Sequence, residues 1–561
     1  MATILLSLCA CAGTRQESEE LVNEGQTLTE KIGKEETEMS RPAFRVGMAS
    51  ADITPTRAVY LEGYEAHDES SFAEPDKFTS DLQARVIVVD NGTDRLVFIN
   101  VEQVFSGWRF GAHTMSENLV ERAAKICGTS TDNVLLSNTH SHQSYMTLGE
   151  EQEKNIADAV KHAYDSLAPA AIGIGTYCTA FGASRDGNYT MDLTKPYDSQ
   201  MNVIRFDNAE TGEPIGLIYS VPMHNTLFGN GPGLKERHNL LSCEFTGYTS
   251  RKIEEAVGVE TGSFVAMHIN GFYGNATGIA KGKYYAEDQE ELIEMGGLFA
   301  KEILNVYNEI ETEERFGDIT TAFVDTSIPC NKSDTAYMKQ FGNYTDMPLG
   351  ITLGAFGDIA FIGVNYEPFS IIGARLKAES PYGTLLPAAN VNGWKGYIPT
   401  KETVEAHKSA YEAECAPTKT PFDEAAEEVF YEEAMNALCS LAGVTMERTE
   451  ASSNNCKLVG KGALYTFDFA DAPNLSKLVI SFAQTARTDC ASKFELMVYD
   501  EVGNLILKKD YEEYSVNYIG VPLDGRKVAS AELIVEERYM NGAEGIDLLP
   551  AEIYGVTFTA K

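Results

Sequence analysis

The stretch NVLLSNTHSHQSY, residues 133–145, runs from an apolar segment into two histidines, His140 and His142. The apolar residues 134–136 predict a buried strand, and side chains two positions apart on an extended segment point to the same face. A strand that ends in His-x-His can therefore aim two imidazoles at one point, as zinc sites require. Two histidines in a polar loop can equally be hydrogen-bonded loop residues, so the pair alone leaves both interpretations open.

Two later apolar runs also end in side chains that can bind zinc. Residues 214–226, PIGLIYSVPMHNT, contain His224, and residues 358–369, DIAFIGVNYEPF, contain Glu367. Because the carboxyl ends of strands in an α/β sheet gather at one edge, we expect these side chains to meet there. Taken singly, each could be an ordinary loop residue. Together with His140 they form a two-histidine, one-carboxylate set typical of a catalytic zinc ion.

The pattern of strand-like and helical segments divides the chain into three parts. Residues 41–445 alternate between the two patterns and predict an α/β, or mixed α+β, catalytic domain with a large mixed sheet. Residues 446–561 contain short strand candidates separated by turn residues, which predict a small antiparallel β-sandwich without catalytic residues. Residues 1–40 are an apolar start followed by a polar, charged tether.

Charge and cysteine usage exclude several functions. The chain has 83 acidic against 45 basic residues, a formal net charge of -38, so nucleic acid is not an expected partner. A lipid substrate would have to be held by apolar contacts. The cysteines form no Cys-x-x-Cys pair, which argues against a thiolate zinc site. No segment offers about 18 consecutive apolar residues, so no transmembrane helix is expected.

The first residues, MATILLSLCACAG, are similar to the end of a bacterial lipoprotein signal, with Cys11 as the lipid-anchored residue. A positively charged start is missing, and the alternative is a frayed apolar terminus. The signal interpretation predicts an extracytoplasmic protein, either a cell-surface lipoprotein or a secreted one.

Several motifs occur in the order found in one enzyme family. The chain resembles the neutral ceramidases, zinc amidases that cleave ceramide into sphingosine and a fatty acid. The segments that carry the resemblance are RVGMASADITPTRAVYLEGYE (45–65), NTHSH (138–142), VPMHNT (221–226), NYEPFSIIGARL (365–376) and NVNGWKGYIPTKETVEAHKSAYEAE (390–414).

The resemblance implies a zinc ion bound by His140, His224, Glu367 and Tyr397. Tyr397 would otherwise be interpreted as a half-buried loop aromatic, and the resemblance alone makes it a ligand.

The resemblance also implies three residues that contact the substrate. His142 would lie near its polar head, Arg185 would line the site, and Tyr411 would lie near the scissile amide. Without the resemblance, Arg185 would be a surface charge and Tyr411 part of the apolar face of a helix.

The chain departs from the family pattern beside the site. Asn275 stands where the family has an aspartate, Thr277 where it has a serine, and the bulky residues Phe272 and Tyr273 replace small ones. The expected activity is hydrolysis of the N-acyl bond of a ceramide-like lipid. The alternatives are a zinc hydrolase acting on another small or glycosylated amide or ester, and a non-enzymatic binding protein with a structural metal.

Overall fold

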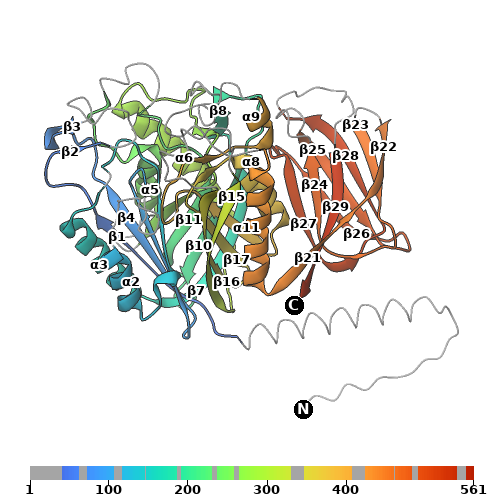
Figure 1. Ribbon diagram of the computed structural model, residues 1–561, viewed down its shortest axis with the longest axis horizontal. Helices are drawn as coiled ribbons and strands as arrows, with labels where there is room; N and C mark the ends of the chain where they lie inside the picture. Colours follow the sequence, from blue (N-terminus) through green and yellow to red (C-terminus); the bar gives the residue numbers. More distant parts are fainter. Residues whose placement is uncertain are drawn as a thin grey trace, which may run out of the picture.

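The computed structural model describes most of the chain after residue 40 (Figure 1). The described residues are 41–61, 72–105, 117–145, 147–185, 191–229, 237–257, 264–329, 346–406, 424–459, 462–482, 490–539 and 551–561. The predicted signal with Cys11, and Tyr411, lie outside them. Within these residues, no helix is long and apolar enough to cross a membrane.

A nine-stranded mixed sheet forms the body of the fold, with the strand order β12-β11-β10-β7-β1-β4-β5-β6 and β14 paired to β7. Its strands are β1 (Arg45–Asp52), β4 (Gln83–Asp90), β5 (Arg95–Val101), β6 (Val134–Asn138), β7 (Ala168–Cys178), β10 (Gln200–Asn208), β11 (Pro214–Val221), β12 (Val265–Asn270) and β14 (Glu313–Glu314). The β5–β6 and β11–β12 pairs are parallel. The remaining neighbouring pairs in this order are antiparallel: β10–β11, β7–β10, β1–β7, β1–β4 and β4–β5. The large mixed sheet expected from the sequence is confirmed.

Four helices cover one face of this sheet: α2 (Glu117–Cys127), α3 (Glu150–Asp165), α5 (Glu244–Val257) and α6 (Gln289–Glu309). The period of two along each strand sends alternate side chains to opposite faces. Val86 and Val88 of β4 pack in the core under these helices, whereas Ile87 and Val89 belong to the core of the other face.

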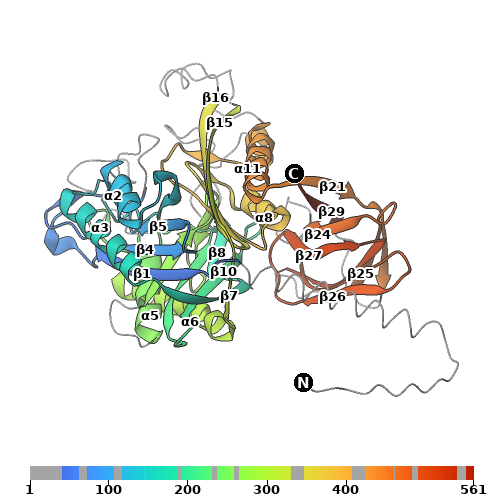
Figure 2. The same cartoon turned by 90° about the horizontal axis from the view of Figure 1, so that it is seen from below.

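The opposite face packs on a second sheet with the order β15-β16-β17-β19. Its strands are β15 (Ile319–Pro329), β16 (Asp346–Phe356), β17 (Ile359–Val364) and β19 (Thr384–Ala388). Phe98 of β5 and Phe361 of β17 meet between the sheets, with ring centroids 4.2 Å apart. The outer face of the second sheet packs on α8 (Ser370–Glu379) and α11 (Ala426–Ala442). The layers are thus helices, sheet, sheet and helices (Figure 2).

The remaining strands build a C-terminal β-sandwich (Figure 1). One sheet has the order β21-β29-β24-β27 and the other β22-β23-β28-β25-β26. Their bounds are β21 (Val444–Glu450), β22 (Ser452–Val459), β23 (Gly462–Asp468), β24 (Asn474–Phe482), β25 (Ala491–Tyr499), β26 (Leu505–Tyr511), β27 (Tyr518–Lys527), β28 (Ser530–Arg538) and β29 (Ala551–Ala560). The antiparallel sandwich expected in the fold class is therefore present. β21 begins two residues before the predicted boundary at 446, and the domain boundaries stay a prediction.

Short elements complete the fold around the edge of the main sheet. They are β2 (Val59–Tyr60), β3 (Phe72–Ala73), β8 (Gly182–Arg185), β9 (Met191–Asp192), β13 (Ala276–Gly278), β18 (Glu367–Pro368), β20 (Tyr397–Ile398), α9 (Lys401–Ala406) and the 3-10 turns Pro75–Lys77 and Thr131–Asn133. β13, β8 and β9 form one small sheet, and β18 pairs with β20.

Candidate metal centre

Three chain segments leave their strands and bring ligand side chains together. His140 follows β6 by two residues, His224 follows β11 by three, and Glu367 follows β17 by three. Their candidate ligand atoms all lie within 4.8 Å of one another, and all three side chains are buried. The backbone of His140 is left-handed, with φ 60°, a strained conformation for a residue with a β-carbon. The three side chains converge as the sequence predicted, but they come from two sheets and not from one edge of a single sheet.

Backbone carbonyls orient both imidazoles. The Nδ1 of His140 lies 2.9 Å from the Val104 carbonyl oxygen, and the Nδ1 of His224 lies 2.7 Å from that of Ala276. A carbonyl only accepts, so each Nδ1 carries the proton and each Nε2 is left with a lone pair. Such second contacts fix the tautomer that metal-binding histidines need.

Glu367 presents one carboxylate oxygen to the same point. Its Oε1 accepts hydrogen bonds from Asn390 Nδ2 at 3.0 Å and Trp394 Nε1 at 2.9 Å. Its Oε2 is buried without a hydrogen-bond partner and lies 3.3 Å from the Nε2 of His224. A buried carboxylate oxygen without a donor is costly, and a cation placed among these acceptors would remove that cost.

Arg185 and His142 lie directly beside the two imidazoles. Arg185, at the end of β8, donates from Nη2 to the His224 Nε2 at 2.9 Å and to the Gly274 carbonyl oxygen at 3.3 Å. The Nε2 of His142 lies 3.1 Å from the Nε2 of His140. Because His140 carries its proton on Nδ1, His142 is the donor in that pair. Two of the three predicted contact residues, His142 and Arg185, therefore lie beside the candidate ligands, and the third, Tyr411, lies outside the described residues.

Tyr397 reaches the site from the short strand β20. β18 and β20 are parallel, and Glu367 is the pairing partner of Tyr397. The hydroxyl of Tyr397 accepts a hydrogen bond from Arg185 Nη2 at 3.3 Å. The preceding residue, Gly396, has φ +107°, a conformation that favours glycine and turns the chain into β20. The structure thus brings Tyr397 next to the other three candidates, and its role as a ligand stays a prediction.

Burial sets the protonation state of the cluster. It lowers the pKa of both His140 and His224 to about 4, with Glu367 acting in the opposite direction on each. Burial also opposes ionisation of Glu367, but His140, His224 and the Asn390 hydrogen bond hold its pKa well below its usual range. Two neutral imidazoles and one carboxylate are the forms that bind a metal ion at neutral pH.

Three further side chains surround the candidate ligands, of which sequence reasoning placed Tyr273 beside the site but missed Asn390 and Trp394. Tyr273 packs its ring against both histidines, with centroids 4.7 Å from His140 and 4.8 Å from His224. Asn390 donates from Nδ2 to Tyr273 Oη at 2.6 Å as well as to Glu367. Trp394 is the other donor to Glu367. The only sequence signal was the run of turn residues in the segment 390–396 that precedes Tyr397.

Asn275 connects strand β8, which carries Arg185, to helix α8, which follows Glu367 in the chain. Its carbonyl oxygen accepts from the Arg185 N–H at 2.8 Å, and its Nδ2 donates to Ser184 Oγ at 3.3 Å. Its Oδ1 accepts from the N–H of Ser370, the first residue of α8, at 2.7 Å. An amide can donate and accept at once, whereas an ionised aspartate only accepts. The asparagine at this position therefore suits the contacts around it.

The donor set fits zinc. Imidazole nitrogens and a carboxylate oxygen are common zinc ligands, and the lone pairs of two histidines and the unpartnered Oε2 of Glu367 face one another.

Comparison with solved structures shows which fold this is. The neutral ceramidase from Pseudomonas aeruginosa superposes with a TM-score of 0.55 at 16% identity, covering 92% of this chain and 98% of that one. A ceramidase complexed with C2 gives the same TM-score at 14% identity, covering 92% and 99%. No family model matches the sequence, and no curated protein matches it either. The chain therefore has the fold of neutral ceramidase over almost its whole length.

Proposed function

We propose that this protein is a zinc-dependent hydrolase that cleaves the N-acyl bond of a ceramide-like lipid, with His140, His224, Glu367 and Tyr397 as metal ligands. One observation carries the proposal. The three buried acceptors lie within 4.8 Å of one another at the strand ends of a ceramidase fold, and Glu367 Oε2 has no donor. The resemblance in the motifs adds Tyr397 as the fourth ligand.

Zinc in this position would supply a Lewis acid for a carbonyl and would lower the pKa of water to about 7. Arg185 Nη2 and His142 Nε2 lie next to the two imidazole nitrogens, so both can donate to an oxygen that gains negative charge there. His142 can then carry a proton to the leaving amine as a general acid. Tyr411, assigned to the scissile amide by the resemblance, belongs to this proposal without a described position.

A second candidate acts on a smaller amide or ester with the same metal set. Tyr273 fills the space against both histidines, and Trp394 stacks on Phe105 with centroids 4.7 Å apart. These aromatic side chains narrow the surroundings of the ligands and favour a compact substrate. A third candidate is a binding protein with a structural zinc, in which the same four side chains would fill the coordination sphere, whereas the hydrolase would need a further position for water or substrate.

One set of measurements separates the three candidates. Zinc content is determined on purified protein, followed by assays with ceramide in detergent micelles, a short N-acyl amide and an aryl ester. We expect one zinc per chain and fatty-acid release from ceramide. Turnover of the small substrates without ceramide supports the second candidate, and bound zinc without any turnover supports the third.

Two histidine variants test the assigned roles. His224→Ala removes a ligand and should lose zinc and activity together. His142→Ala removes only a donor beside the metal and should keep zinc but lose about 10²–10³-fold in rate. A zinc-free His142→Ala protein would show that the roles within the His140–His142 pair are wrong.

Export is part of the same proposal. The start of the chain resembles a lipoprotein signal with Cys11 as the anchor, which would bring the protein to lipid outside the cytoplasm. Cells labelled with a radioactive fatty acid should transfer the label to this protein, and Cys11→Ser should abolish the transfer. Label in the Cys11→Ser protein would contradict the anchor.

A further inference from the structure

Helix α8 begins directly after the metal-ligand candidate Glu367. Glu367 and Pro368 form β18, Phe369 precedes the helix, and Ser370 is its first residue. The N–H of Ser370 is held by Asn275, which also binds the strand of Arg185. Almost the whole helix is buried. Any shift of α8 along its axis would therefore move the Glu367 carboxylate relative to the two histidines.

The other end of α8 is held by the C-terminal β-sandwich. Lys477 of β24 donates from Nζ to the carbonyl oxygen of Ser380, the residue that ends the helix, and to that of Tyr382 at 3.2 Å. Lys477 is only 7% exposed. A cation at the last carbonyls of a helix satisfies acceptors that have no partner within the helix and interacts favourably with the helix dipole.

A second contact holds the same turn. Tyr554 of β29 donates from its hydroxyl to Glu379 Oε1 at 2.8 Å, and Glu379 is fully buried. Next to it, a β-carbon on Gly520 of β27 would lie 2.2 Å from the carbonyl oxygen of Ala378. The sandwich strand therefore touches the helix backbone directly, and only glycine allows that approach.

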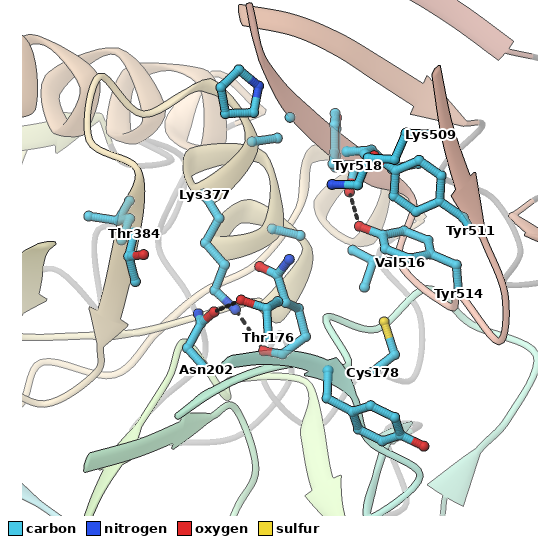
Figure 3. A pocket seen from close by; sticks show the side chains of 18 of the residues that line it. Thr176, Cys178, Asn202, Lys377, Thr384, Lys509, Tyr511, Tyr514, Val516 and Tyr518 are labelled. Atoms are coloured by element: carbon cyan, nitrogen blue, oxygen red, sulfur yellow. Dashed lines mark hydrogen bonds between the residues drawn. The ribbon is translucent and has the colours of Figure 1, made fainter. Parts of the chain in front are cut away.

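Beside α8 the sandwich and the body separate. A cavity of about 390 Å³ lies between them, with Thr176, Asn202 and Lys377 on one side and Tyr511 and Tyr514 on the other (Figure 3). Figures 1 and 2 both place α8 between the body and the sandwich. Helix α8 is one direct connection between the sandwich and the metal centre, beside the buried contact of Ser199 Oγ with Ser515 Oγ at 2.5 Å.

We propose that Lys477 and Tyr554 are positioning residues for the metal centre, because they fix the helix that presents Glu367. This inference rests on the proposed function. A helix of ten residues spans about 15 Å and is stiff over that length, so clamping one end sets the position of the other. The sandwich would then help to position Glu367 at the zinc site, although none of the proposed ligands belongs to it.

Lys477→Met tests the inference with a buried, uncharged side chain of similar length. Lys527→Met is the matched control, since Lys527 lies on the exposed surface of the same sandwich and pairs only with Glu501. Zinc affinity is measured by competition with a chelator, under conditions where unfolding curves show each protein to be folded. We expect Lys477→Met to bind zinc about tenfold more weakly with a lower kcat and an unchanged KM. Lys527→Met should match the wild type.

Two further variants keep the test decisive. Lys477→Arg restores the cation and should recover most of the zinc affinity, and Tyr554→Phe, which keeps the ring, should weaken zinc binding a few-fold even if Lys477→Met fails to fold. A purely structural role predicts a lower Tm with wild-type zinc affinity, and that result would overturn the inference.

Hydrogen exchange separates this inference from the proposed function. Residues 367–380 of the metal-free Lys477→Met protein should exchange faster than in the wild type, while the Lys527→Met protein should not differ. If the wild type binds no zinc, the proposed function is wrong, but faster exchange at 367–380 would still support the clamp. Unchanged exchange there would refute it.

Discussion

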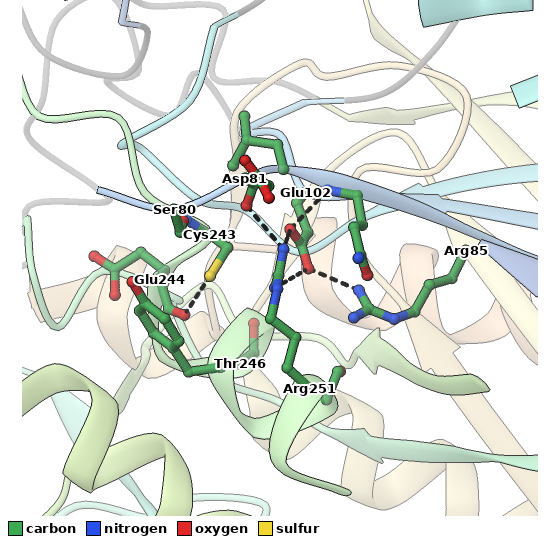
Figure 4. A network of polar contacts seen from close by, with 12 residues as sticks. Ser80, Asp81, Arg85, Glu102, Cys243, Glu244, Thr246 and Arg251 are labelled. Carbon is green, nitrogen blue, oxygen red and sulfur yellow. Dashed lines mark hydrogen bonds and ion pairs between the residues drawn. The ribbon is translucent and has the colours of Figure 1, made fainter. Parts of the chain in front are cut away.

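Two clusters of buried charged and ionisable groups lie on the main sheet, and they satisfy their acceptors in opposite ways. In the first, Glu102 accepts from Arg85 Nη1 at 2.7 Å and from both terminal nitrogens of Arg251 at 3.0 Å (Figure 4). Its Oε2 also accepts from the Gln83 N–H at 2.8 Å. In the second, the metal centre, Glu367 Oε2 has no donor and faces the imidazoles of His140 and His224.

The difference separates a structural cluster from a binding site. Burial alone would raise the pKa of Glu102, but Arg251 and Arg85 offset it and lower the pKa overall. The positive charges that balance the Glu102 carboxylate therefore come from Arg85 and Arg251. At the metal centre Arg185 donates to the Nε2 of His224, but no described residue donates to the Oε2 of Glu367. The paired carboxylate of Glu102 supports the fold, whereas the unpartnered Oε2 of Glu367 makes the second cluster a candidate site for a cation.

The largest effect is expected from Glu367→Gln. The amide keeps an oxygen for Asn390 and Trp394 but replaces the free carboxylate oxygen with an NH₂ group, which does not bind zinc. Zinc affinity should fall by several orders of magnitude, and the metal-free protein should be as stable as the wild type or more so, because an unpartnered oxygen is removed. Zinc titration and thermal unfolding of the apo protein check both parts. Full zinc occupancy in the Glu367→Gln variant would show that the unpartnered oxygen of Glu367 does not mark a zinc site.

Glu102→Gln should produce the reverse pattern. Removing the carboxylate charge takes the shared partner from the buried Arg85 and the partly exposed Arg251, although Arg85 keeps Glu254 and Arg251 keeps the Asp81 carbonyl. The free energy of unfolding should fall by about 3 kcal/mol, the lower end of the range for a broken buried ion pair. Zinc stoichiometry should not change. Urea unfolding measures the loss, and Glu254→Gln serves as the control because that side chain is 20% exposed and contacts Arg85 only through Nε. Equal losses in the two variants would contradict the special role of Glu102.

Glu244 provides a third buried carboxyl, which has neither a direct arginine pair nor a metal centre. Its Oε1 accepts from the N–H groups of Phe228 and Gly229, yet burial raises its pKa to about 8. Between pH 4.5 and 8 the unfolded chain releases this proton and the folded chain keeps it. The free energy of unfolding should therefore fall as pH rises through this window, by an amount on the order of 5 kcal/mol, and then level off.

The comparison with Glu244→Gln isolates this effect. The variant cannot titrate at this position, so the difference in stability between it and the wild type should change with pH between 4.5 and 8 and be constant above 8. A difference that does not vary with pH would mean that Glu244 is ionised in the folded protein like Glu102.

The smallest effect is expected from Trp394→Phe. This change keeps an aromatic ring beside Phe105 but removes one of the two donors to Glu367 Oε1. Loss of such an outer contact should weaken zinc binding by about tenfold, with little change in Tm. Phe105→Leu is the control, since it disturbs the stacked pair without touching the hydrogen bond. Weaker zinc binding in the control alone would show that packing, and not donation, orients Glu367.

The sequence predicted the parts of the site that depend on local patterns. Apolar runs before His140, His224 and Glu367 mark strand ends, and these ends do meet, although Glu367 follows a strand of the second sheet and not of the main sheet. Arg185 and Tyr397 came from the resemblance alone, because a single arginine or tyrosine in a loop has no distinctive spacing. The roles of all these residues stay predictions.

Other parts could not be predicted because they depend on contacts between distant segments. The imidazoles are oriented by the backbone carbonyls of Val104 and Ala276. Every residue has a backbone carbonyl, so the sequence does not show which carbonyls take this role. Asn390 meets Glu367 because β19 pairs in parallel with β17 within the second sheet, and no local pattern of residue types marks that pairing. The mixed sheet and the sandwich were predicted, but the division of the body into two packed sheets was not, since strand patterns do not show which strands share a sheet.

The position of the metal-centre residues in two different layers has a consequence for the order of folding. His140 and His224 follow strands of the main sheet, while Glu367 and Tyr397 follow strands of the second sheet. The pocket exists only after both layers have docked, so contacts of long sequence separation precede it. Zinc should then bind after the rate-limiting step of folding. It would slow unfolding without speeding refolding, and protein made without zinc should reach the native fold and load the metal afterwards.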